Sequence, residues 1–233
     1  MPYEFDRKQR IAVIGGGPGG YEAALAGAQL GADVTLVERV GVGGAAVLTD
    51  VVPSKTLIAS AEATDGISGA GDLGVQFSLP NASGRATRPD VAVNLGVINR
   101  RVRDLARQQS EDLRTNLEQA GVRILTGEGR LDSPGRVIVS TGKGRTAHDF
   151  DEIEADTVVI ATGSSPRKLP AAMPDGERIL TWTQLYELDE VPEHLVVVGS
   201  GVTASPRAWK TAVRPCIEAT DASGSAVVQS PAA

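Results

Sequence analysis

The stretch "RIAVIGGGPGGYEAALAGAQLGADVTLVE", residues 10–38, decides the fold. Residues 11–14 form a short, mostly β-branched run, which is typical of a strand buried on both faces of a parallel sheet. The alanine-rich residues 21–30 favour a helix that Gly31 ends, and residues 32–38 supply a second strand. This order predicts a βαβ unit at the start of an α/β domain.

The turn between the first strand and the helix carries Gly15, Gly17 and Gly20 in the spacing G-x-G-x-x-G. Glycine suits this turn because it is tight and because a pyrophosphate must approach its backbone closely. The N-terminus of the following helix then offers N–H groups and the positive end of a dipole to that phosphate. Glu38 ends the second strand about 20 residues further on, where a carboxylate can accept the ribose hydroxyls. The pattern predicts a dinucleotide site, and the motif alone does not separate FAD from NAD.

The middle of the chain is predicted to be helical. After a loop at residues 41–55, residues 54–64 favour a helix and residues 65–90 a loop. A long amphipathic helix is expected over 91–119, with one apolar position missing at Gln109. The apolar residues that define it are Val91, Leu95, Ile98, Val102, Leu105, Leu113 and Leu117.

From Val122 onward, apolar residues recur at the spacing that is typical of strands. Strands are expected in the segments "VRILTGEG" (122–129) and "RVIVST" (136–141), and around 148–153. Two more buried strands, "DTVVIATG" (156–163) and "HLVVVG" (194–199), each end in a glycine turn.

Composition and charge exclude several classes of partner. The 233 residues are 41% hydrophobic and 22% charged, as in a water-soluble globular protein, and the net charge of −6 argues against binding to nucleic acid. The single cysteine, Cys216, allows no intramolecular disulfide. The first apolar run is too short for a signal peptide or a membrane span, which predicts a cytoplasmic protein without membrane insertion. Neither His148 nor His194 has a ligand-spaced partner, so no metal site is expected.

Three further motifs lead to a family. These are "GG" at 43–44, "PSK" at 53–55 and "ATG" at 161–163. Together with the N-terminal βαβ unit they resemble the pyridine nucleotide–disulfide oxidoreductases, FAD enzymes such as lipoamide dehydrogenase and glutathione reductase, over roughly residues 9–203. The resemblance implies a Rossmann-like FAD-binding domain, made of a parallel sheet and a small β-meander, followed by an NAD(P)-binding domain.

The resemblance also implies roles for individual residues. Gly44 would let the backbone approach the flavin or the pyrophosphate, and Thr162 and Gly163 would lie over the adenosine half of FAD. Lys55 matches the family lysine near flavin N5, where a cation favours the anionic reduced flavin, and it is the expected catalytic residue. The glutamate that pairs with this lysine in the family is replaced here by Pro206.

The redox-active cysteines of the family are missing. Their positions hold Ala46 and Val51, and thiol–disulfide exchange needs a thiolate that neither residue can supply. The segments 43–60 and 175–203 most resemble a cysteine-less branch of the family, the NAD(P)H:quinone reductases with a lipoamide-dehydrogenase-like fold. That branch implies hydride transfer from NAD(P)H through FAD to a small quinone-like acceptor.

The second glycine motif, formed by Gly199, Gly201 and Ala204, would open the NAD(P)H domain. Pro206 and Pro215 then interrupt the expected helix, and no second strand is evident. We therefore expect a frame-shifted or truncated end after about residue 203, which leaves out the family's homodimer domain. The predicted domains are an FAD-binding domain at 9–165, a connector with the first strand and turn of the NAD(P)-binding domain at 166–204, and a disordered tail at 205–233.

Two alternative functions stay open. One is a dihydrolipoyl dehydrogenase type of enzyme, against which Ala46 and Val51 argue. The other is a catalytically inactive FAD-binding remnant of a truncated gene. NADH oxidation assayed with a quinone and with lipoamide separates quinone reduction from dihydrolipoyl dehydrogenase activity. FAD binding without any NADH oxidation would indicate the remnant.

Overall fold

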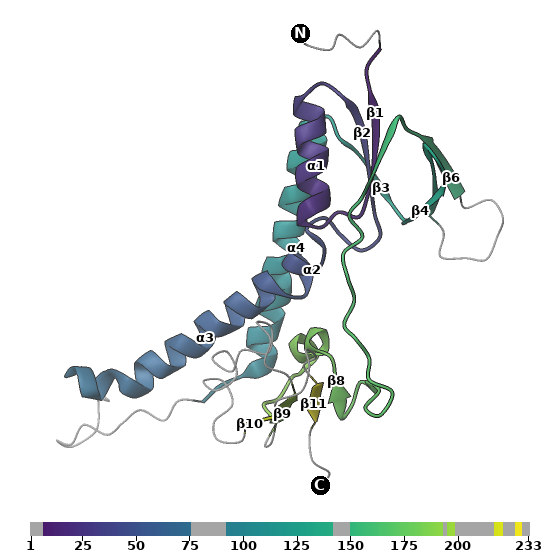
Figure 1. The fold of residues 1–233 in the computed structure, drawn as a ribbon. Coiled ribbons are helices and arrows are strands. Elements are labelled where there is room, and N and C mark those ends of the chain that lie inside the picture. Colours follow the sequence, from purple (N-terminus) through teal and green to yellow (C-terminus); the bar gives the residue numbers. More distant parts are fainter. Residues whose placement is uncertain are drawn as a thin grey trace. The chain divides into compact units, whose positions relative to one another are not determined.

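The computed structural model describes residues 7–75, 92–141, 150–192 and 195–198, and the backbone of two short strands at 217–220 and 227–229. The chain forms two compact units, whose elements are drawn in Figure 1. The first unit takes the chain up to Val51 and again from Leu105 to Ser165. The second takes Val52–Asp104 and the chain from Pro166 onward.

The first unit is built on a parallel four-stranded sheet of order β3-β2-β1-β7. Its strands are β1 (Arg10–Ile14), β2 (Asp33–Glu38), β3 (Arg123–Thr126) and β7 (Thr157–Ile160). Helix α1 (Pro18–Gln29) connects β1 to β2, as the βαβ pattern predicts. Because β2 and β7 pair with opposite sides of β1, the strand order reverses at the β1–β7 pair. Ligands of open α/β sheets bind at such a switch point, outside the carboxyl ends of the strands.

Side chains alternate between two separate cores on the faces of this sheet. In β1, Val13 packs toward α1 and the C-terminal part of α4 (Leu95–Gln119), whereas Ala12 and Ile14 pack toward the opposite face. Figure 1 shows α1 on one face of β1 and β2, with β4 (Glu128–Ser133) and β6 (Phe150–Glu154) on the other. The core on the helix side comprises Val13, Ala24, Val34, Leu36, Val42, Leu117 and Val122.

The other face is covered by an antiparallel meander of β4 (Glu128–Ser133), β5 (Arg136–Ser140) and β6 (Phe150–Glu154). Val137 and Val139 of β5 are fully buried against the parallel sheet, and Ile153 of β6 lies beside them. The parallel sheet and the meander confirm the fold class inferred from the sequence. The separate strand β4, which runs past the expected 122–129 segment, was not predicted.

The helices near residue 50 correct the sequence analysis. The expected 41–55 loop contains a short helix, α2 (Gly44–Leu48), and the helix predicted at 54–64 extends over Val51–Gly69 as α3. Pro53 lies buried in the first turn of α3, where proline is tolerated because that turn needs no N–H. The loop predicted at 65–90 is wrong at its start, since α3 continues into a 3-10 turn, η1 (Ala70–Leu73). Residues 76–91 lie outside the described part of the chain.

Helix α4 spans Leu95–Gln119 and starts later than the predicted 91. The Oδ1 of Asn94 accepts a hydrogen bond from the Val97 N–H at 3.0 Å, which caps the first turn of the helix. The apolar face also differs, because Leu105 is 37% exposed while Ala106 and Ser110 are buried. The small Ser110 is thus buried next to the gap at Gln109, and Ala106 is buried next to the exposed Leu105.

The second unit has a sheet of order β10-β9-β11-β8. Its strands are β8 (Ile179–Leu180), β9 (Leu195–Val198), β10 (Ile217–Thr220) and β11 (Val227–Gln229), with a 3-10 segment, η2 (Trp182–Glu187). The expectation of a single strand in this region is wrong, since β10 pairs parallel to β9 and β11 pairs antiparallel to it. Its core comprises Leu57, Leu95, Val102, Leu180, Leu185, Tyr186, Leu195 and Val197.

Candidate functional site

A cavity of about 580 Å³ opens in the first unit at the carboxyl ends of β1, β2 and β7. This is the switch point of the sheet, where a nucleotide is expected. The wall is formed by the turn before α1 and the start of that helix, the end of β2 and the segment after it, helix α2 and the residue after it, and the turn after β7. The lining residues are Gly15, Gly17, Pro18, Gly19, Glu38, Arg39, Val40, Gly44, Ala45, Ala46, Leu48, Thr49, Ala161, Thr162, Gly163, Ser164 and Ser165.

Two glycines of the first motif are required by the protein itself. Gly15 has φ +101°, and a Cβ there would lie 2.3 Å from the carbonyl oxygen of Ala161. A Cβ on Gly20 would lie 1.8 Å from the carbonyl oxygen of Gly15. These contacts let the start of α1 pack directly on the turns that follow β1 and β7.

Gly17 is different, because nothing in the protein requires a glycine at this position. It is the N-cap residue of α1 with φ −69° and ψ −179°, an extended conformation that any residue adopts. A Cβ on Gly17 would meet no atom within 4 Å, and the residue lines the cavity. Pro18 follows and has no N–H, so Gly19 supplies the first N–H of the helix itself. The open space therefore lies at the positive end of the α1 dipole.

Glu38 lies at the end of β2 on the wall of the same cavity, as the motif predicts. Its Oε2 accepts a hydrogen bond from the Gly16 N–H at 2.6 Å. Its Oε1 accepts bonds from the Val40 N–H at 2.7 Å and from the Gly41 N–H at 3.3 Å. The carboxylate thus touches the turn after β1 and the segment after β2 at the same time.

The "ATG" turn reaches the cavity because β7 pairs with β1. The register sets Ile14 opposite Ile160, and the Ala161 N–H donates to the Ile14 carbonyl at 2.8 Å. Thr162 and Gly163 then follow on the cavity wall, and Gly163 adopts a positive φ of +69°. The two motifs, about 145 residues apart in the sequence, are neighbours because their strands are adjacent.

The double glycine also folds against the first motif. A Cβ on Gly44, which has φ +55°, would lie 2.9 Å from the Cα of Gly17. Gly43 was not among the expected site residues, yet its N–H donates to the Gly16 carbonyl at 2.7 Å. The repeated glycine was the available signal, because two adjacent glycines before a short helix indicate a close backbone approach.

A second, smaller cavity of about 190 Å³ adjoins Gly15, Glu38, Arg39 and Thr162. Its remaining wall comes from Ile14, Val37, Gly127, Glu128 and Gly129. The residues around Gly127 were predicted only as part of a strand and not as wall residues. Two glycines flanking one charged residue are too common a pattern to point to a site.

Three of the expected site residues lie outside the described part of the first unit. Lys55 lies on α3 in the second unit and is exposed, and Gly199 and Gly201 lie outside the described residues. The two positions of the missing cysteines belong to the first unit, where Ala46 lines the cavity and Val51 is 49% exposed.

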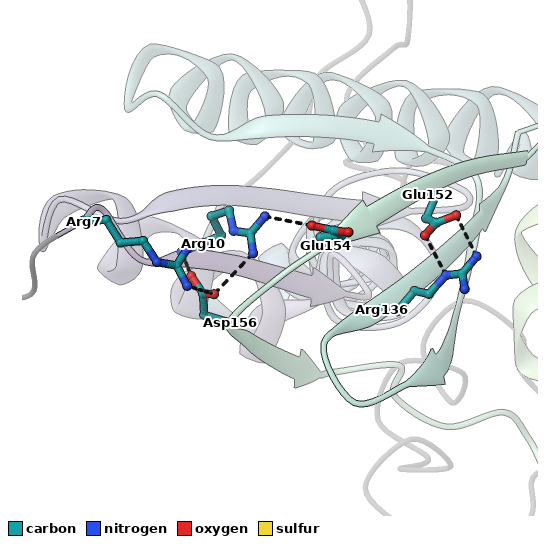
Figure 2. A network of polar contacts seen from close by, with 6 residues as sticks. All are labelled: Arg7, Arg10, Arg136, Glu152, Glu154 and Asp156. Atoms are coloured by element: carbon teal, nitrogen blue, oxygen red, sulfur yellow. Dashed lines mark hydrogen bonds and ion pairs between the residues drawn. The ribbon is translucent and has the colours of Figure 1, made fainter.

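Charged residues of the first unit also form a network away from the cavity, at the amino ends of β1 and β7 (Figure 2). Asp156 accepts bonds from the Arg10 backbone N–H at 2.9 Å and from the side chains of Arg7 and Arg10 at 2.6 and 3.3 Å. These hydrogen bonds, led by the one from the Arg10 backbone, lower the pKa of Asp156 to about 2. Figure 2 also shows Arg136 facing Glu152 across the meander.

Neither a metal-binding cluster nor a membrane-spanning helix is found in the described part of the chain. No group of three or more His, Cys, Asp or Glu side chains is placed to hold a metal ion among those residues. None of the helices they form is both long and apolar enough to cross a membrane.

Comparisons with known proteins show which family this chain is similar to. The family model of pyridine nucleotide-disulphide oxidoreductases matches residues 9–213. The NAD(P)H dehydrogenase (quinone) of Mycobacterium tuberculosis is 45% identical over 205 residues, which cover 84% of this chain and 39% of that protein. A dihydrolipoyl dehydrogenase of Chlorobaculum parvum is 35% identical over 201 residues, covering 85% of this chain and 39% of that enzyme.

A solved structure extends the similarity to three dimensions. The crystal structure of LpdA from Mycobacterium tuberculosis matches with a TM-score of 0.77 and 40% identity, covering 91% of this chain and 44% of that one. The chain thus spans about two fifths of the length of these relatives. On its motifs, its fold and the extent of the match, the chain belongs to the pyridine nucleotide-disulphide oxidoreductase family.

Proposed function

We propose that the chain is the nucleotide-binding part of an FAD-dependent oxidoreductase that passes hydride from NAD(P)H to a quinone-like acceptor without a redox-active disulfide. The observation that carries the proposal is the cavity at the sheet's switch point, where Gly17 leaves open space at the N-terminus of α1 and Glu38 lines the same wall. A relative of this chain in Mycobacterium tuberculosis is named NAD(P)H dehydrogenase (quinone), which supports the proposed quinone-like acceptor.

The residues present fit the adenosine diphosphate half of FAD. The N–H groups at the start of α1 and the missing side chain of Gly17 suit a pyrophosphate, which needs close approach and a positive dipole end. A carboxylate at Glu38 can accept a ribose hydroxyl. Thr162 and Gly163 line the same cavity.

When bound, the flavin supplies the two-electron chemistry, and the protein supplies binding and electrostatics. Gly17 and Gly19 would hold the phosphates through the backbone, and Glu38 would orient the ribose. Ala46 leaves an inert methyl group on the cavity wall where the family has a thiol. Lys55 is proposed to place a cation beside the reacting ring, and Gly199 and Gly201 to bind the nicotinamide nucleotide. We also propose a cytoplasmic enzyme that forms the family homodimer in a longer chain.

The experiment that tests the proposal begins with a visible absorption spectrum. FAD is added to the purified chain, excess flavin is removed by gel filtration, and the retained flavin is measured against protein. Near-stoichiometric retention of flavin supports the proposal that FAD binds in the cavity. A colourless protein contradicts that proposal.

The second arm tests the acceptor by following NADH and NADPH oxidation with menadione and, in parallel, with lipoamide. We expect no lipoamide reduction, since the chain offers a single cysteine, Cys216, and a dithiol relay needs two. Turnover with menadione supports quinone reduction. Turnover with lipoamide would contradict the proposal, and flavin retention without any turnover would indicate an inactive FAD-binding remnant.

A further inference from the structure

Glu38 joins two parts of the cavity wall through its own carboxylate. Gly16, which donates to Oε2, belongs to the turn that precedes α1. Val40 and Gly41, which donate to Oε1, belong to the segment that follows β2. These contacts lie within the protein and involve no ligand.

The sequence around the turn is adapted to this contact. Gly16 is buried, and a Cβ on it would lie 3.0 Å from both the Cγ and the Oε2 of Glu38. Gly16 is not one of the three motif glycines, so phosphate binding alone does not explain it. Its missing side chain leaves room for the glutamate. The Gly43 N–H, bonded to the Gly16 carbonyl, holds the same peptide from the other side.

We propose that Glu38 is a positioning residue that holds the phosphate-binding turn and the 40–41 segment in their binding geometry before the nucleotide arrives. This rests on the proposed function, because it assigns a second task to a residue of the FAD cavity. Hydrogen bonds from N–H groups to a charged acceptor are stronger than neutral ones, so three of them on one carboxylate hold both segments firmly.

The number of bonds limits what Glu38 can offer the ribose. An ionised carboxylate has about four acceptor sites. Three are used by the amides of Gly16, Val40 and Gly41, two on Oε1 and one on Oε2. Glu38 therefore accepts one ribose hydroxyl through Oε2 while it keeps its backbone bonds, and the turn stays in place when the nucleotide binds.

Amide hydrogen exchange of the full chain without FAD tests the positioning role directly. The wild type is compared with Glu38→Ala, Glu38→Gln and a control, Glu111→Gln, which removes the same charge from the exposed face of α4. In Glu38→Ala we expect exchange at Gly16, Val40 and Gly41 to accelerate about tenfold or more, since each amide loses a charged acceptor. In Glu111→Gln these three rates stay at wild-type values.

Glu38→Gln gives a finer readout, because an amide side chain has one acceptor oxygen and an NH₂ group that cannot accept. It can satisfy either Gly16 or the Val40–Gly41 pair, so only one of the two sets should lose protection. The affinity for FAD should fall about tenfold or more in Glu38→Ala and less in Glu38→Gln, because the retained bonds preserve part of the preorganised geometry.

Two results would overturn the proposal: unchanged exchange at the three amides in FAD-free Glu38→Ala, or loss of their protection when FAD binds to the wild type. If Glu38→Ala does not fold, which exchange at Val13 and Leu36 of the core strands would reveal, the split pattern in Glu38→Gln decides. A wild type that binds no FAD would contradict the proposed function, whereas exchange in the free chain would still test the positioning role.

Discussion

Glycines surround the cavity for two different physical reasons. Gly15 and Gly20 are required by the protein, because a Cβ on either would overlap a backbone oxygen. Gly17 leaves open space, and its conformation suits any residue. The motif predicted all three, but only the contacts of the folded chain separate the glycines that maintain the fold from the one that leaves room for a ligand.

Gly17→Ala should fold normally and bind FAD more weakly. The added methyl group meets no protein atom, and it occupies the space expected for a phosphate, so we expect the affinity to fall about tenfold or more while the melting temperature stays within about 2 °C of wild type. Flavin retention and thermal unfolding measure the two effects.

Gly20→Ala is the matched comparison. Its Cβ would lie 1.8 Å from the Gly15 oxygen, so we expect a loss of about 3 kcal/mol in the free energy of unfolding. Equal stability losses in Gly17→Ala and Gly20→Ala would contradict the distinction between the two glycines.

Asp156 gives the first unit a defined acid sensitivity. Because its hydrogen bonds lower its pKa to about 2, below the ordinary 3.8, the ionised form is stabilised by folding. This contribution is present above about pH 4 and is lost as the pH falls through about 2. In Asp156→Asn we expect lower stability at pH 7 and a smaller loss between pH 4 and 2. Urea unfolding at a series of pH values measures the stability of both proteins. An unchanged pH profile in Asp156→Asn would contradict the assignment of this acid sensitivity to Asp156.

The elements show how far apolar periodicity can be trusted. The βαβ unit was predicted to within a few residues at the N-terminus of α1, because strand, glycine turn and alanine-rich helix all favour the same structure. The start of α4 was not, because apolar spacing continues back to Val91 while the cap at Asn94 sets the N-terminus. Helix α2 was missed because five residues after a double glycine carry too little periodic signal.

Asn94→Ala should destabilise α4. Removing the side chain leaves the Val97 N–H without this acceptor, which costs about 1 kcal/mol for a helix cap. Asn116→Ala is the control on the same helix, since Asn116 is exposed near the C-terminal end and alanine is the better helix former. In chemical unfolding we expect the free energy of unfolding to fall in Asn94→Ala and to rise in Asn116→Ala. Destabilisation of similar size in both variants would argue against the cap.

At the scale of the molecule, the sequence predicted the fold class and most of the first unit but not the composition of the second. The prolines at 206 and 215 lie outside the described residues, and they carried no information on whether later residues pair with β9. Most wall residues of the cavity, such as Arg39 and Ser164, were also hidden, because they have no motif of their own and reach the site only through the order of the strands.

The location of the cavity within the first unit predicts that the two cores affect nucleotide binding differently. Leu36→Ala and Leu185→Ala each remove a buried leucine, from the first and second unit respectively, and each should cost about 2–5 kcal/mol. With ADP as the probe, we expect Leu36→Ala to weaken binding and Leu185→Ala to leave it near wild type. Calorimetric titration measures the affinities, and equal losses would contradict the assignment of the ADP site to one unit.

Strand β7 lies at an outer side of the parallel sheet and pairs only with β1 among the strands that the structure describes. Its last residue, Ile160, is 63% exposed. An open strand edge with an exposed apolar residue is a template for edge-to-edge pairing with another polypeptide. The practical consequence is colloidal: the protein should self-associate as it is concentrated, so light scattering should rise steeply with concentration. Ile160→Lys should suppress that rise.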